Sequence, residues 1–285
     1  MNWVKTFFWM TIMTLVLVVG GSLLFGRTGV ILGFGLALVM NGAAYFFGDR
    51  IALAAAQAQE VSPAEAPMLH ALADRLAAQY HVPKPAVYVS PDPSPNAFAT
   101  GRSPSHASIC VNQGLLQILN QEELYGVLAH EFAHVRNRDI LISTIVAVLA
   151  GAITVLAQIG QFGLFWGGGR DEEDQSPLGL IGVLLFVILG PIAAMLIQLA
   201  ISRSREYEAD HTGAEVSHDP LALASALRKL QRASEIVPSE TAQPAFAHLY
   251  LVNPLSGRSF ATLFSTHPPL DERIRRLERM AHHAR

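Results

Sequence analysis

Four long runs without a charged residue limit most strongly how this chain can fold. A helix of roughly 20 apolar residues crosses the hydrocarbon core of a bilayer, and each run has about that length or more. Only 15% of the residues are charged and 51% are hydrophobic, whereas roughly 25% charged residues are usual in soluble domains. We therefore expect an integral membrane protein with four helical spans. The runs are Phe7–Phe25, Val30–Phe47, Ile140–Trp166 and Leu178–Ile201.

The first two runs favour a membrane hairpin over a cleaved signal peptide. The apolar core of a signal peptide normally has about 7 to 15 residues and precedes a small-x-small cleavage site. Here Gly26–Gly29 makes only a short connection before the second run begins, and Asp49 and Arg50 mark the return to water. For the two central runs, a buried helical hairpin in a soluble core is the alternative interpretation.

Charges beside the runs predict the orientation of the spans. Loops on the cytoplasmic side of a membrane carry an excess of lysine and arginine. The central pair of runs has arginines at both far ends and the acidic sequence Asp171–Asp174 between them, and Lys5 precedes the first run. We therefore expect a multi-pass protein of the plasma (inner) membrane whose polar segments face the cytoplasm. The flanking arginines are Arg136, Arg138, Arg203 and Arg205.

The polar segments on either side of the central hairpin predict helices and a small sheet. Residues 51–79 are alanine-rich and are expected to be helical, with interruptions at Pro63 and Pro67. Apolar residues at helical spacing predict amphipathic helices, and short β-rich runs between turn residues predict two or three strands. The helices are Met68–Leu76, Leu221–Arg232 and Leu270–Met280, and the strands are Ala86–Val89, Asn96–Gly101 and Ser108–Val111.

A capped helix is expected just before the third run. Asn120 is a good N-cap residue, and Glu123 three residues later closes a capping box, so the helix should begin near Gln121. Its C-terminal end leads through Arg136 and Arg138 directly into the third run. Side chains on this helix are therefore expected close to the membrane surface.

The capped helix carries a His-Glu-x-x-His motif. His130 and His134 are four residues apart, so they lie on one helix face about one turn from each other, where both imidazoles can bind one metal ion. Glu131 between them points to where a water on that metal would sit. A catalytic zinc site usually has three protein ligands and one open position. The rest of the chain must therefore supply a further carboxylate.

A pair of carboxylates that meets this need follows the fourth run. Glu206 and Asp210 are four residues apart and share a helix face, whereas Glu208 points about 200° away from Glu206. One acid of the pair can bind metal while the other orients a ligand imidazole. The alternative is that these acids are solvated beside the neighbouring arginines.

Four motifs stand in order along the chain: Asn96-Ala97-Phe98-Ala99, His130-Glu131-Phe132-Ala133-His134, Ser202–Asp210 and Thr266-His267-Pro268-Pro269. Together they resemble the HtpX-type membrane zinc metalloproteases, which are relatives of the CAAX prenyl endopeptidases. The arrangement of the spans matches as well, so the resemblance covers nearly the whole chain. The stretch Ser234–Phe264 matches least well.

The resemblance implies a metal site and its chemistry. It implies that His130, His134 and Glu206 ligate one zinc ion per chain. Glu131 would act as the general base that takes a proton as water attacks the scissile carbonyl. Asp210 would contact a metal ligand and not the metal itself.

The resemblance also implies how substrate is held. An edge strand would pair with an extended polypeptide substrate, and His267 or Arg203 would help to stabilise the oxyanion. The alternatives are a plain hairpin residue at Asn96, a core aromatic at Phe98 and a partly exposed turn residue at His267. The expected edge strand consists of Asn96, Ala97, Phe98 and Ala99.

The expected fold class is a membrane protein with α-helical spans and an α+β, zincin-like catalytic domain that contains a small sheet. Residues 1–49 would form two membrane helices, 50–139 and 202–285 the two parts of the catalytic domain, and 140–201 a membrane hairpin between them. The resemblance implies a zinc metalloendopeptidase (EC 3.4.24 type) in the stress response and membrane protein quality control. Its substrates would be polypeptides, mainly membrane or misfolded proteins.

Two other functions compete with this interpretation. A four-span transport protein with a structural zinc site would be expected to carry charges within its spans, but the runs hold only isolated polar residues such as Asn41, Gln158 and Gln198. An inactive scaffold is disfavoured by the intact Glu131. The balance of 20 basic and 23 acidic residues, without a basic stripe, predicts no nucleic-acid partner. The single cysteine, Cys110, excludes a cysteine-based zinc cluster and is expected to be buried.

Overall fold

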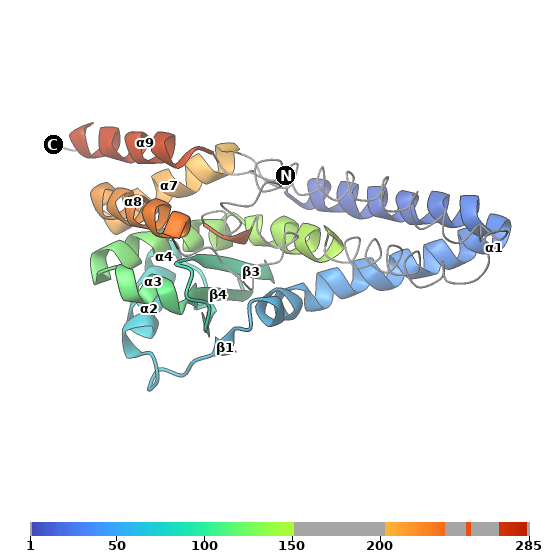
Figure 1. Cartoon of the computed structure of the whole chain (residues 1–285), viewed down its shortest axis with the longest axis horizontal. Coiled ribbons are helices and arrows are strands. Elements are labelled where there is room, and N and C mark those ends of the chain that lie inside the picture. Colours follow the sequence, from blue (N-terminus) through green and yellow to red (C-terminus); the bar gives the residue numbers. More distant parts are fainter. Residues whose placement is uncertain (1, 151–202, 237–248, 252–267, 284–285) are drawn as a thin grey trace, which may run out of the picture.

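A computed structural model of the chain describes residues 2–150, 203–236, 249–251 and 268–283, which are mostly helical with one small mixed sheet (Figure 1). Several predicted features lie outside these residues. They are the third run after Ala150, the acidic loop Asp171–Asp174, the fourth run Leu178–Ile201, most of Ser234–Phe264, and His267.

The N-terminal region is one helix, α1 (Asn2–Ala55), with a sharp bend at Gly26. Gly26 has φ 58° and ψ −136°, a conformation that glycine adopts readily because it has no Cβ. The bend folds the two arms back toward each other (Figure 1), and the side-chain amide of Asn41 donates across them to the carbonyl of Met10 at 3.3 Å. The first two runs therefore form a helical hairpin whose connection is a bend at one residue and not the expected four-residue loop, and its crossing of a membrane stays a prediction.

The surface of α1 is strongly apolar. Large hydrophobic side chains along both arms are exposed, among them Phe7, Ile31 and Val39, and contiguous apolar surface marks contact with membrane or protein. Within the described residues, Gly26–Ala55 is the helical segment long and apolar enough to cross a membrane, and Thr6–Val19 and Asp139–Ala150 are shorter apolar helices. The arrangement of four spans stays a prediction.

The chain after the second run differs from the expected helix. Asp49 and Arg50 do not end α1, which continues to Ala55, because charged residues can mark where a helix enters water without stopping it. The chain then turns and forms a short strand, β1 (Gln59–Glu60), which pairs antiparallel with the next strand. Pairing with a neighbour outweighs the helix propensity of this alanine- and glutamine-rich stretch.

The sheet has the strand order β1–β2–β4–β3. The three predicted strands are confirmed as β2 (Ala86–Ser90), β3 (Ala97–Ser103) and β4 (His106–Asn112). β2 and β4 run parallel, whereas β3 and β4 run antiparallel with Ala99 opposite Ile109. β3 is therefore an edge strand, as predicted for the stretch that contains Ala97 to Ala99.

Helices cover both faces of the sheet. α2 (Pro67–Tyr80) and α4 (Gln121–Arg136) pack on one face, and the C-terminal end of α1 and the helix that begins at Asp139 pack on the other. Alternate residues of a strand point to opposite faces, so Ile109 packs beneath α4 while Cys110 lies in the second cluster. Cys110 is buried, as predicted, and burial raises the pKa of its thiol.

Three C-terminal helices complete the domain: α7 (Arg203–Ser217), α8 (Pro220–Ile236) and α9 (Leu270–His283). α7 and α8 pack against α4, and α9 packs on α8 and α7 (Figure 1). Glu123 fastens α8 to the start of α4, because its carboxylate accepts hydrogen bonds from Ser225 at 2.7 Å and Lys229 at 2.6 Å. The segments before residue 151 and after residue 202 thus fold together around α4.

Candidate metal centre and catalytic site

The helix α4 begins where predicted. The Asn120 side chain accepts a hydrogen bond from the Glu123 backbone N–H at 2.8 Å, and the Glu123 carboxylate accepts one from the Asn120 N–H at 3.0 Å. This capping box fixes the first turn of the helix. With the start fixed, the four-residue spacing presents His130 and His134 on the side that faces α7.

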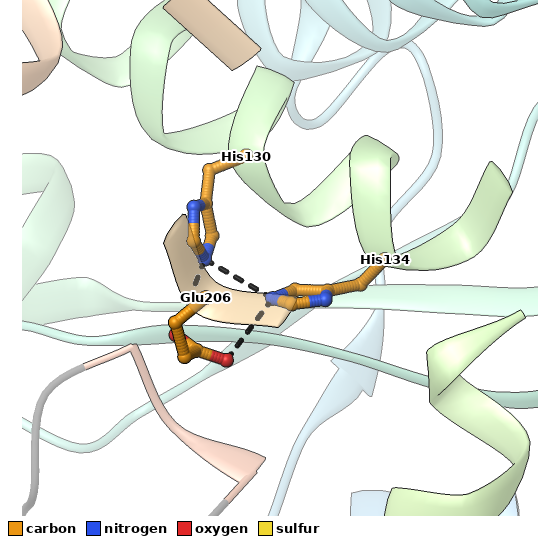
Figure 2. A group of neighbouring side chains, drawn as sticks. All are labelled: His130, His134 and Glu206. Atoms are coloured by element: carbon orange, nitrogen blue, oxygen red, sulfur yellow. Dashed lines mark hydrogen bonds and ion pairs between the residues drawn. The ribbon is translucent and has the colours of Figure 1, made fainter. Parts of the chain in front are cut away.

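Three predicted ligand side chains converge between α4 and α7 (Figure 2). The Nε2 atoms of His130 and His134 are 3.1 Å apart, and they lie 3.7 Å and 3.5 Å from the two carboxylate oxygens of Glu206. Ligands that bind one zinc ion tetrahedrally at about 2.0 to 2.2 Å are separated by about 3.3 to 3.6 Å. The three side chains therefore have the spacing and the donor atoms that one metal ion needs.

The other nitrogen of each imidazole faces a carboxylate. His130 Nδ1 lies 2.9 Å from Asp210, and His134 Nδ1 lies 3.2 Å from Asp139. A proton held on Nδ1 by a carboxylate leaves the Nε2 lone pair free for a metal ion and fixes the direction of the ring. Asp210 is where the sequence predicts it. Asp139 was not predicted.

Arg273 of α9 is a second residue of the site that the sequence motifs do not predict. It is fully buried and donates two hydrogen bonds of 2.7 Å to the carboxylate of Asp210, and its Nη1 lies 3.6 Å from Glu206. Burial alone raises the pKa of Asp210, but the Arg273 charge and hydrogen bonds outweigh it and lower that pKa to about 2. Arg273 therefore keeps Asp210 ionised beside His130.

The titratable groups of α4 respond to burial in opposite ways. Burial lowers the pKa of His130 and raises that of Glu131 to about 8. Burial also lowers the pKa of His134, but its hydrogen bond to Asp139 and the nearby acidic charges outweigh this effect and raise it to about 9. A cation bound between the ligands would favour neutral imidazoles and an ionised Glu131. The ligand charges and the base are thus coupled to the presence of metal.

The predicted edge strand lies beside Glu131. The Ala99 N–H donates a hydrogen bond to the Glu131 carboxylate, and the carbonyl of Ala97 accepts one from the Leu251 N–H at 3.1 Å. Both alanines thus point backbone groups away from β4. The Phe98 side chain is 1% exposed and packs with its ring 5.1 Å from that of Tyr250. A substrate contact by β3 would therefore use its backbone and not the Phe98 ring.

Asn96, Arg203 and Glu208 lie outside the cluster of ligand side chains. Asn96 is buried directly before β3, with its side chain accepting a hydrogen bond from the Ala97 N–H at 3.2 Å. Arg203 is exposed at the first residue of α7, less than one turn before Glu206. Glu208 is exposed while Glu206 and Asp210 are buried, in agreement with the predicted helix faces.

Comparison with known proteins places the chain in a family. Residues 63–281 match a model of peptidase family M48. A protease HtpX homologue of Syntrophobacter fumaroxidans is 54% identical over 267 residues, which cover 93% of this chain and 94% of the relative. One of Pyrococcus furiosus is 51% identical over 279 residues, or 98% and 96% of the two chains.

A solved structure is also similar. The crystal structure of S. mikatae Ste24p has a TM-score of 0.47 and 20% identity, and covers 85% of this chain and 57% of its own. The resemblance expected from the sequence motifs is confirmed by the family match and by the curated relatives. The chain therefore belongs to peptidase family M48, among the HtpX-type members of that family.

Proposed function

We propose that this protein is a zinc-dependent endopeptidase of the plasma (inner) membrane that cuts membrane and misfolded proteins. The observation that carries the proposal is the spacing of 3.1 to 3.7 Å among the ligand atoms of His130, His134 and Glu206, with Glu131 between the two histidines. Membership of a peptidase family and relatives named as proteases support the reaction type.

The donor set favours zinc over magnesium and calcium. Two imidazole nitrogens and one carboxylate oxygen are a ligand set of catalytic zinc sites, which keep a fourth position open. Magnesium and calcium prefer sites built from oxygen atoms alone. One zinc ion per chain follows from the single cluster of this kind among the described residues.

The residues around the cluster would divide the chemistry between them. Zinc, when bound, supplies a Lewis acid that polarises a carbonyl oxygen and acidifies water. Glu131 takes the proton from the attacking water and passes it to the leaving amine, and the Ala99 N–H holds its carboxylate in place. General acid–base catalysis of this kind contributes about 10² to 10⁴-fold. His267 or Arg203 supplies a donor for the oxyanion.

The edge of β3 gives the substrate a place to bind. An extended polypeptide can add to an exposed sheet edge through backbone hydrogen bonds. On β3 such pairing would use the outward backbone groups of Ala97 and the carbonyl of Ala99, beside Glu131, because the Ala99 N–H already donates to the Glu131 carboxylate. At the Ala97 carbonyl the substrate competes with the Leu251 N–H, which occupies that acceptor in this structure.

The order of the helices along the chain suggests how the protein is placed in the membrane. The two arms of α1 cross the bilayer, and the helix that begins at Asp139 starts the central hairpin directly after α4. The arginines Arg136, Arg138, Arg203 and Arg205 would then hold the metal site close to the cytoplasmic surface. Substrates that emerge from the membrane reach the β3 edge from this side, which suits protein quality control.

The test is Glu131→Gln in detergent-purified protein loaded with zinc. We expect casein cleavage to fall by about 10²-fold or more, while the zinc content stays at one ion per chain because Glu131 is not a ligand. Glu208→Gln, which changes an exposed acid on α7, is the matched control and should cleave casein normally. Unchanged casein cleavage by Glu131→Gln would rule out the proposed reaction.

A further inference from the structure

Gly213 lies where α7 packs against the backbone of α4 at His130. A Cβ built on Gly213 would stand 3.0 Å from the backbone nitrogen of His130 and 3.1 Å from its Cα. These neighbours are helix backbone and not the flexible end of a side chain. A side chain at this position therefore fits only if one helix moves relative to the other.

A glycine inside a helix needs such a reason. Glycine is unfavourable in a helix interior compared with alanine, and Gly213 lies within α7 (Arg203–Ser217). A left-handed backbone does not account for it, because its φ is not positive. The close approach to His130 explains why this position has no side chain.

The face of α7 that carries Gly213 is the face that serves the metal site. Glu206, Asp210 and Gly213 follow one another at spacings of four and three residues, so they form one stripe along the helix. Glu206 and Asp210 each contact His130 from this stripe. The contact at Gly213 therefore sets how far both carboxylates stand from the histidine.

The tolerance of a metal site makes this distance important. An added Cβ at 3.0 to 3.1 Å would force its neighbours apart by a few tenths of an ångström. Metal–ligand distances are held within about 0.2 Å of their ideal values. A shift of that size exceeds what the site accepts, whereas overpacking elsewhere in a core typically has a modest cost in stability and leaves the fold in place.

We infer that Gly213 is a positioning residue for the metal centre. Its missing side chain lets α7 lie against the backbone of His130, and this approach places Glu206 for the metal and Asp210 for His130 Nδ1. The inference rests on the proposed zinc site, and it adds a residue that touches neither metal nor substrate.

Gly213→Ala tests this, with Gly126→Ala as a matched control. Gly126 is also inside a helix and packs equally closely, since a Cβ there would lie 3.1 Å from the backbone nitrogen of Leu223 on α8. The two substitutions thus add the same atom at similarly tight contacts, one at the metal site and one at the α4–α8 interface. Any general effect of crowding α4 appears in both variants.

The measurements are zinc affinity, by competition titration of metal-stripped full-length protein in detergent, and the visible spectrum of bound Co²⁺, which reports ligand geometry. We expect Gly213→Ala to bind zinc about 10 to 100-fold more weakly, which is the usual effect of substituting residues that orient metal ligands. We also expect it to alter the Co²⁺ spectrum. Gly126→Ala should lose less than about tenfold in zinc affinity, below that range, and keep its spectrum.

Each outcome decides a different point. Equal zinc affinity in Gly213→Ala and the unmodified protein would overturn the inference, and so would equal losses in both variants. A Gly213→Ala chain that does not fold would also contradict it, because the expected displacement leaves the core intact. If the unmodified protein binds no zinc, the proposed function itself fails.

Discussion

Replacing Arg273 by methionine removes the cation that compensates a buried carboxylate. Arg273 is fully buried and donates two hydrogen bonds of 2.7 Å to Asp210. Methionine keeps a long, adaptable apolar side chain at this position, so the variant mainly removes charge and hydrogen bonds. In Arg273→Met, the charge of Asp210 stays buried without its main partner.

The structure allows the size of this effect to be worked out. Burial alone raises the pKa of Asp210, but Arg273 and His130 together lower it from 3.8 to about 2. A lowering of that size corresponds to about 2 to 3 kcal/mol of stability at neutral pH, and removal of one partner of a buried pair costs about 3 to 5 kcal/mol. We expect Arg273→Met to lower the free energy of unfolding of the metal-free protein by about 3 to 5 kcal/mol.

Unfolding in detergent with EDTA, followed by circular dichroism, measures this difference. The pKa of Asp210 is lowered in the folded protein, so its contribution is complete above an unfolded pKa of about 3.9 and is lost as the pH falls toward about 2. The difference between unmodified protein and variant should therefore shrink over that range. Asp210→Asn combined with Arg273→Met should be more stable than Arg273→Met alone. A difference below about 1 kcal/mol near pH 7 would refute the reasoning, since one pKa unit alone is worth that much.

Two further predictions concern the ligand shell and the membrane. Asp139→Asn weakens the acceptor of His134 Nδ1, so zinc affinity measured by competition titration should fall about 10 to 100-fold; an unchanged affinity would mean that Asp139 does not orient the imidazole. Protease added outside sealed spheroplasts should leave the chain around Ala209 intact, because α7 is expected on the cytoplasmic side, and cleavage there would reverse the proposed orientation.

The parts of the site that were predicted depend on local patterns. The capping box at Asn120 and Glu123 involves neighbouring residues, so the start of α4 follows from the sequence alone. The i, i+4 spacing of His130 and His134 and the opposite faces of Glu206 and Glu208 follow from helix geometry. Three of the four strands were predicted for the same reason, because turn residues bound each β-rich run.

The parts that were missed depend on the backbone or on distant partners. Asp139 reaches His134 after a turn in which Arg138 has a left-handed conformation with φ 59°. Arginine rarely adopts this conformation, so the sequence does not predict the turn. Arg273 pairs with Asp210, which lies 63 residues earlier. The sequence carries one signal for Arg273. It lies on the same face of α9 as the apolar residues Leu270, Ile274 and Leu277, and an arginine on a buried face needs a charged partner. β1 has two residues, too few for any pattern.

Zinc content of Glu206→Ala and Glu208→Ala tests the central claim most directly. The two acids lie two residues apart on α7, one buried at the cluster and one exposed, so the pair changes the same chemistry at opposite faces of one helix. By elemental analysis of purified protein, Glu206→Ala should lose most of its zinc, whereas Glu208→Ala should keep one ion per chain. Full zinc in Glu206→Ala, or its loss in Glu208→Ala, would contradict the assignment of the third ligand.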